Sequence, residues 1–186
     1  MGKITLITGG ARSGKSRFAE ELLKGEDNVL YVATGIAFDD EMKDRIVKHR
    51  EGRNEGWETV EAHRNLDSVL ENIIKDKKYI LIDCLTLMVS NLMVLNKEID
   101  WDKTDIKTAN GIEKEIQTEL ENILKFAKEF LGEIIIVTNE IGMGVVPPTP
   151  LGRYYRDIAG RMNQIVAEAA DNVYFLVSGI PVKIKG

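Results

Sequence analysis

Short apolar runs alternate along the chain with longer segments in which apolar residues recur every three or four positions. The short runs are rich in valine and isoleucine, as strands covered on both faces are. They predict strands over 3–8, 28–34, 79–83, 133–138 and 172–178. The longer segments predict helices over 15–24, 39–51, 65–75, 85–95, 110–131 and 151–170. This alternation predicts an α/β fold, with a mainly parallel sheet and helices on both of its faces.

Three segments lie outside this alternation. The tail 178–186 predicts a turn and a last short strand that is antiparallel to its neighbour. The segment 96–110 is polar and lies between two predicted helices, so we interpret it as a flexible connection. The loop 139–150 is rich in glycine and proline and follows the carboxyl end of a strand. Because ligands of parallel sheets gather at that edge, this position favours a functional loop.

Composition narrows the class of protein. A length of 186 residues suits a single domain over 1–186, and the net charge of −5 argues against nucleic-acid binding through a broad basic surface. The single cysteine, Cys84, cannot form an internal disulfide, which fits a reducing cytoplasm. The most apolar stretch, 85–95, is too short to span a bilayer. We therefore expect a cytoplasmic enzyme or switch without a membrane span.

The run GGARSGKS carries the most specific local signal. It matches the phosphate-binding pattern G-x-x-x-x-G-K-[ST] through Gly9, Gly14, Lys15 and Ser16, with a predicted strand before it and a predicted helix after it. Glycines let backbone N–H groups surround phosphates, and the start of a helix favours negative charge. Lys15 would reach the β- and γ-phosphates, and the Ser16 hydroxyl would bind Mg²⁺. The run therefore predicts that a nucleoside triphosphate is held here.

Asp83 is a candidate metal-binding residue because it ends the predicted strand 79–83. A carboxylate at the carboxyl end of a strand in a P-loop protein is the expected partner of Mg²⁺. An aspartate that starts a turn or caps the following helix is the alternative.

The predicted helix 39–51 places Met42, Ile46 and His49 on the face opposite its acidic residues, and Arg50 and Arg53 adjoin that face. A histidine on an apolar face is usually a core residue. Guanidinium groups, however, are hard to bury without anions, and a triphosphate is such an anion. A neutral imidazole among phosphates can also act as a nucleophile. Both interpretations of His49 stay open on the pattern alone.

Other chemically notable residues give weaker signals. We interpret His63 as a surface residue and Cys84 as a buried, unreactive thiol. Trp57 and Trp101 fit the core or its rim equally well.

Several blocks of the chain carry a resemblance to one family. They are TGGARSGKSRFAE, YVATG, HREGRNEGWETVE, VTNEIGMGVVP and RYYRDIAGRMNQ, and the third and fourth are far more specific than the first. In their order and spacing the chain resembles the bifunctional adenosylcobinamide kinase / adenosylcobinamide-phosphate guanylyltransferase family of cobalamin biosynthesis. The resemblance runs essentially end to end, and it implies a RecA-like P-loop NTPase fold.

The resemblance implies two reactions. ATP or GTP phosphorylates adenosylcobinamide, and GTP then donates GMP to the new phosphate, which gives adenosylcobinamide-GDP and pyrophosphate. It implies that His49 carries GMP covalently, that Lys15 is catalytic, that Ser16 and Asp83 hold Mg²⁺, and that the chain forms a homotrimer. The nucleotide-binding residues that it implies are Gly9, Gly10, Ala11, Arg12, Ser13, Gly14, Lys15, Ser16, Thr34, Gly35, Arg50, Arg53, Glu61 and Asp83.

Two alternatives to this function remain. One is a simple P-loop kinase of a small molecule, in which His49 is structural. The other is a non-catalytic P-loop switch.

Overall fold

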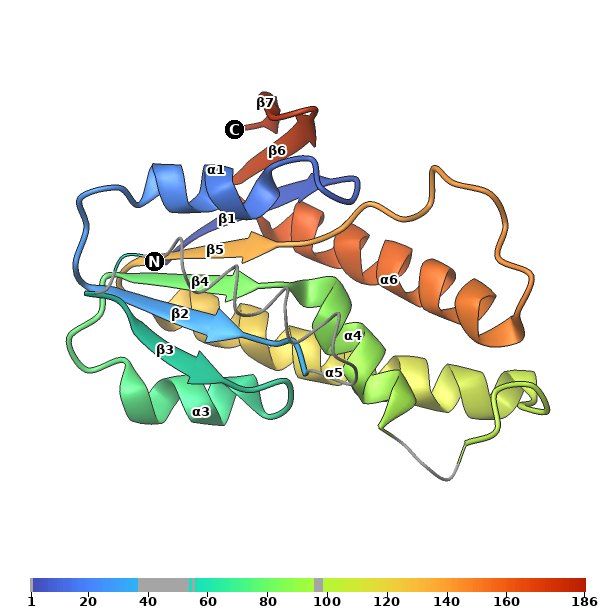
Figure 1. The fold of residues 1–186 in the computed structure, drawn as a ribbon. Helices are drawn as coiled ribbons and strands as arrows, with labels where there is room; N and C mark the ends of the chain where they lie inside the picture. Colours follow the sequence, from blue (N-terminus) through green and yellow to red (C-terminus); the bar gives the residue numbers. More distant parts are fainter. Residues whose placement is uncertain (1, 37–53, 55, 96–98) are drawn as a thin grey trace.

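The computed structural model describes residues 2–36, 54, 56–95 and 99–186. Its centre is a seven-stranded sheet in the order β3-β2-β4-β5-β1-β6-β7 (Figure 1). All neighbouring strands are parallel except β6 and β7. The strands are β1 (Lys3–Gly9), β2 (Val29–Ala33), β3 (Glu58–Glu61), β4 (Tyr79–Asp83), β5 (Glu133–Val137), β6 (Asn172–Val177) and β7 (Ile180–Lys185).

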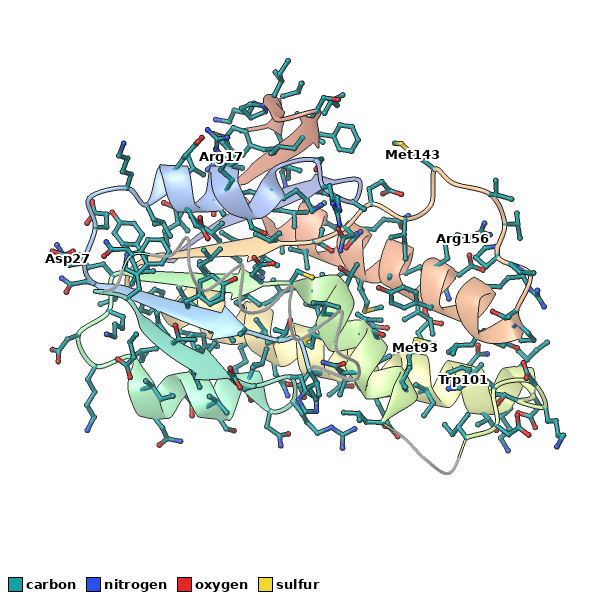
Figure 2. The ribbon with its side chains drawn as sticks, viewed as in Figure 1. Arg17, Asp27, Met93, Trp101, Met143 and Arg156 are labelled. Atoms are coloured by element: carbon teal, nitrogen blue, oxygen red, sulfur yellow. The ribbon has the colours of Figure 1, made fainter. Side chains whose placement is uncertain are left out.

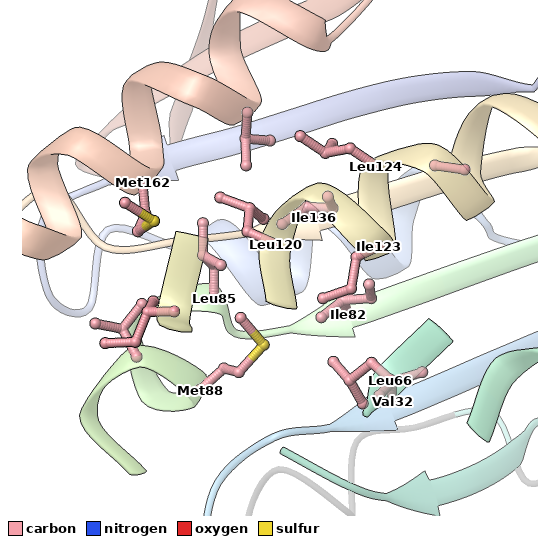
Figure 3. Packing of buried hydrophobic residues seen from close by; sticks show 14 of the residues in the cluster. Val32, Leu66, Ile82, Leu85, Met88, Leu120, Ile123, Leu124, Ile136 and Met162 are labelled. Carbon is pink, nitrogen blue, oxygen red and sulfur yellow. The ribbon is translucent and has the colours of Figure 1, made fainter. Parts of the chain in front are cut away.

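Helices cover both faces of the sheet, as predicted. One face is covered by α3 (Leu66–Ile73), α4 (Leu85–Val94), α5 (Ile106–Glu129) and α6 (Pro150–Ala169). Their buried side chains pack against those of the strands and form the larger core cluster with them (Figures 1 and 3). Among the described helices, α1 (Lys15–Leu22) alone covers the other face, where a smaller apolar cluster lies. Within each strand, side chains alternate between the two clusters, as Leu6 and Ile7 do. The predicted α/β P-loop fold class is therefore confirmed.

The register brings four strand ends to the same edge. Glu61 of β3 pairs with Ala33 of β2, Ala33 pairs with Asp83 of β4, and Asp83 pairs with Val137 of β5. Val137 in turn pairs with Ile7 of β1, shortly before the glycine-rich loop. Because parallel strands all end at one edge, this single row of residues determines which loops meet there.

Two predictions are corrected, one about the start of α5 and one about the segment before it. Helix α5 begins at Ile106, earlier than predicted, because Asp105 caps it by accepting a hydrogen bond from Thr108 N at 2.7 Å. Residues 106–110 therefore belong to α5 rather than to the flexible connection that we predicted. Trp101 of that segment is buried and packs against Tyr154, with ring centroids 5.7 Å apart (Figure 2).

The strand β3 was missed altogether, because it is short, largely exposed and lies at the edge of the sheet. Trp57, which precedes it, is buried and donates its ring N–H to Glu26 O at 2.8 Å.

Other segments agree with the prediction or fall outside the described chain. The tail forms β7, which is antiparallel to β6 as predicted. Every helix in the described part of the chain is too short or too polar to cross a membrane. The predicted helix 39–51 lies outside the described residues.

Candidate active site

The glycine-rich loop connects β1 to α1 and depends on two backbone positions that glycine serves best. Gly14 has a φ of 92°, and α1 begins at the next residue, Lys15. A Cβ atom on Gly9 would lie 2.6 Å from the carbonyl oxygen of Leu176 and 2.8 Å from Ser13 Oγ. The loop therefore packs tightly against β6, and the backbone N–H groups at the start of α1 face the same edge as the strand ends.

Lys15 lies across this loop. Its Nζ donates a hydrogen bond to Gly10 O at 2.6 Å, and the side chain is nearly buried. Burial lowers the pKa of Lys15, while the nearby Cys84 and Asp83 act in the opposite direction. The structure thus brings the lysine of the loop close to the carboxylate that ends β4, although the two are far apart in sequence.

Asp83 is half-buried and forms a hydrogen bond with a core tyrosine. Its Oδ2 accepts a hydrogen bond from Tyr31 Oη at 2.9 Å. The helix that follows has Cys84 as its N-cap, so Asp83 is not a helix cap. The structure therefore excludes the capping role, and it places the Asp83 carboxylate close enough to Lys15 to interact with its charge.

Thr34 and Cys84 join the carboxyl ends of β2 and β4. Thr34 Oγ1 accepts a hydrogen bond from Cys84 N at 2.8 Å and donates one to Cys84 O at 2.7 Å. Asn91 of α4 donates a hydrogen bond to Thr34 O at 2.6 Å. Burial raises the pKa of the Cys84 thiol to about 11, so this cysteine is a neutral, buried thiol as predicted.

A network of hydrogen-bonded polar side chains lies where β5 ends, between β1 and β4. The sequence pattern did not predict this network. Asn139 Nδ2 donates a hydrogen bond to Thr86 Oγ1 at 2.9 Å, and Asn163 Nδ2 donates one to Asn139 O at 3.0 Å. Thr138 Oγ1 donates to Asn163 Oδ1 at 2.7 Å, and Tyr155 Oη donates to Thr86 O at 3.1 Å. These bonds fix α4 and α6 to the floor of the site.

The loop after β5 is also attached to the glycine-rich loop. Glu140 N donates a hydrogen bond to Gly9 O at 2.9 Å. The β6–β7 turn contacts the same loop from the other side, because Gly179 N donates to Ser13 O at 2.9 Å. Backbone contacts from two neighbouring connections therefore hold the shape of the loop.

The residues at this edge fit a phosphate-bound magnesium ion. In the described part of the chain, no group of three histidine, cysteine, aspartate or glutamate side chains could hold a metal ion without help. Mg²⁺ commonly binds through one or two protein oxygens together with phosphate and water, which matches the Ser16 hydroxyl and the Asp83 carboxylate. Ser13 Oγ is buried without a hydrogen-bond partner among the described residues, so a polar partner can still be accommodated in the loop.

The structure places the predicted residues unequally. Gly9 to Ser16, Thr34, Gly35 and Asp83 meet at one edge of the sheet, and Glu61 ends β3 at the same edge, on the far side of β2. His49, Arg50 and Arg53 lie outside the described residues. His63, which we interpreted as a surface residue, is half-buried.

Comparison with known proteins identifies the family. The model of the family described as cobinamide kinase / cobinamide phosphate guanyltransferase matches residues 5–184. The chain is 45% identical over 181 residues to the bifunctional adenosylcobalamin biosynthesis protein CobU of Escherichia coli, covering 97% of this chain and 98% of that protein. The CobU protein of Salmonella typhimurium gives the same identity and coverage. The bifunctional adenosylcobalamin biosynthesis protein CobP of Pseudomonas aeruginosa is 40% identical over 182 residues, covering 97% of this chain and 96% of that protein.

These matches extend over nearly the whole chain and include every strand and helix that forms the described edge of the site. They confirm the resemblance that the sequence blocks carried. The chain therefore belongs to the cobinamide kinase / cobinamide phosphate guanyltransferase family.

Proposed function

We propose that this chain phosphorylates adenosylcobinamide with ATP or GTP and then transfers GMP from GTP to the product. The supporting observation is the position of Lys15, whose ammonium group lies across the glycine-rich loop and close to Asp83. That arrangement suits a bound triphosphate, and the family description names cobinamide, the corrinoid part of the acceptor. The products are adenosylcobinamide-GDP and pyrophosphate.

In the kinase step, the hydroxyl oxygen of the acceptor attacks the γ-phosphorus and the bond to the β-phosphate breaks. The nucleoside diphosphate leaves, and the hydroxyl proton is released. Lys15 and the N–H groups at the start of α1 stabilise the negative charge that develops on the departing diphosphate. Mg²⁺, held through Ser16 and Asp83, neutralises phosphate charge when it is bound.

In the transfer step, a ring nitrogen of His49 attacks the α-phosphorus and pyrophosphate leaves. A phosphate oxygen of the acceptor then attacks the same phosphorus, the P–N bond breaks and a diphosphate forms. A neutral imidazole avoids the repulsion between two anions that a direct attack would meet. Arg50, Arg53 and Glu61 complete the nucleotide site in this proposal, with Thr34 and Gly35 at the end of β2.

The assembly and location that we propose follow the family resemblance. The chain acts as a single domain over 1–186, in a homotrimer in the cytoplasm, without nucleic-acid partners. The continuous sheet from β3 to β7 supports the single domain, since strands from both ends of the chain share it.

The most direct experiment follows two radioactive labels, one on the γ-phosphate and one on the α-phosphate of the nucleotide. Purified protein with Mg²⁺ and adenosylcobinamide should transfer the γ-phosphate of labelled ATP or GTP, and should then incorporate α-label from GTP with release of pyrophosphate. In Lys15→Met, the rates of both reactions should fall by about 100-fold or more. Lys24→Met, which changes an exposed lysine just after α1, should lose neither. Transfer of the γ-label alone would favour the simple kinase, and no turnover with this acceptor would favour a switch.

A further inference from the structure

Tyr31 is a buried tyrosine in the middle of β2 whose polar end reaches the candidate active site. Its side chain is only 2% exposed and lies in the apolar cluster beneath α1, among residues such as Leu23 and Leu81. A buried phenol in such surroundings requires a hydrogen-bond partner. Tyr31 Oη donates a hydrogen bond to Asp83 Oδ2 at 2.9 Å.

The sheet register explains why these two side chains meet. Tyr31 pairs with Leu81 on the neighbouring strand, and Asp83 lies two residues further along that strand. Residues two apart in a strand point to the same face, so Asp83 is the diagonal neighbour of Tyr31. Aromatic side chains can span that diagonal distance. The contact is therefore built into two adjacent, well-paired strands rather than into a loop.

The hydrogen bond restricts how Asp83 can act. It occupies Oδ2 and fixes the plane of the carboxylate, while Lys15 lies close to the same group. Partners of this kind hold metal-binding carboxylates in one orientation, and their loss commonly weakens metal binding. A hydroxyl donor orients the carboxylate without bringing a positive charge to it.

We propose that Tyr31 is a positioning residue, which holds the Asp83 carboxylate so that Oδ1 faces the magnesium ion of the bound nucleotide. This inference rests on the proposed function, because it requires Asp83 to serve the metal. It adds a role for a core residue that is only 2% exposed. The alternative is a purely structural role, in which Asp83 only accepts the hydrogen bond that the buried Tyr31 hydroxyl needs.

The test measures metal affinity directly, without turnover. Mn²⁺ binding to the protein with a non-hydrolysable GTP analogue is followed by electron paramagnetic resonance in Tyr31→Phe, which removes only the hydroxyl. We expect the Kd for Mn²⁺ to rise about tenfold, while analogue binding in EDTA stays as in the wild type. Tyr79→Phe is the matched control, because Tyr79 lies at the opposite end of β4 and its loss should leave the Kd unchanged.

Two results would overturn the proposal, and they are distinguishable. A wild-type Kd in Tyr31→Phe together with a raised Kd in Asp83→Asn would remove the role of Tyr31 and leave the metal role of Asp83 intact. A wild-type Kd in both variants would remove the metal role itself. Analogue binding in EDTA shows that each variant is folded. Tyr31→Met, which fills the same space with an adaptable apolar side chain, repeats the test if the phenylalanine variant does not fold.

Discussion

The side-chain hydroxyl of Thr34 is bonded twice to the backbone of Cys84. It accepts a hydrogen bond from Cys84 N at 2.8 Å and donates one to Cys84 O at 2.7 Å. Thr34 directly follows β2 and Cys84 directly follows β4, so one buried hydroxyl closes the gap between two strand ends. The candidate nucleotide site therefore rests, at this point, on two strand ends that one side chain holds together.

Replacing Thr34 by valine should destabilise the protein. The change keeps the shape of the side chain but leaves the buried N–H of Cys84 unpaired, whereas the Cys84 carbonyl still accepts from Leu87 N and Met88 N. We expect the free energy of unfolding to fall by about 2 kcal/mol. Urea denaturation measures this free energy. Thr34→Ser, which retains the hydroxyl, should be nearly as stable as the wild type. Equal stability of the valine variant and the wild type would contradict this account.

Ser13→Ala should affect the free protein and the nucleotide complex in opposite directions. Ser13 Oγ is buried without a partner among the described residues, so its removal should stabilise the free protein by about 1 kcal/mol. In the complex, the hydroxyl can donate to a phosphate oxygen, and its loss should weaken GTP binding about tenfold. Thermal unfolding and calorimetric titration measure the two effects. Ser68→Ala, an exposed change in α3, is the control and should alter neither. A destabilised variant with unchanged affinity would show that Ser13 is purely structural.

The pattern of the sequence predicted the central strands but missed features that depend on the tertiary fold. The strands β4 and β5 contain continuous apolar runs, over 79–82 and 134–137, which signal burial on both faces. By contrast, β3 contains a single apolar residue, Val60, and it is a strand only because its backbone pairs with β2. The early start of α5 was missed because its first apolar residue, Ile106, is 72% exposed.

In the candidate site, too, some features could be predicted from the sequence and others depend on the tertiary fold. The loop from Gly9 to Ser16 was predictable because all its elements are contiguous in the chain. The contacts of Asn139 with Thr86 and Asn163 were not, because the three residues lie on different elements that only the fold brings together. The hydrogen bond between Tyr31 and Asp83 likewise depends on strand register, which the sequence pattern left open.

The N-cap of α5 should make stability depend on pH. Asp105 Oδ1 accepts a hydrogen bond from Thr108 N at 2.7 Å, and the backbone and side-chain hydrogen bonds to Thr108 lower the pKa of Asp105 below its ordinary value of 3.8. A lowered pKa in the folded state means that the cap stabilises the protein above the unfolded pKa and is lost as pH falls through the folded pKa. The stability difference between wild type and Asp105→Ala should therefore shrink as the pH falls from about 5 through the unfolded value of 3.8 and on through the lower folded pKa.

The matched control for that measurement is the cap of α6. Thr149 Oγ1 accepts a hydrogen bond from Gly152 N at 3.2 Å, and a threonine hydroxyl does not titrate in this range. The stability difference between wild type and Thr149→Ala should stay constant with pH. A constant difference for Asp105→Ala as well would contradict the predicted role of its charge.

The central claim is that one P-loop site serves attack at the α-phosphorus as well as at the γ-phosphorus, through His49. Incubation with α-labelled GTP, followed by denaturation, tests it most directly. We predict a protein-bound label that survives alkali and is lost in acid, as a phosphoramidate is. The label should be absent in His49→Ala and retained in His63→Ala, the matched change at the other histidine of the chain. No label in the wild type, or a label that persists in His49→Ala, would contradict the claim.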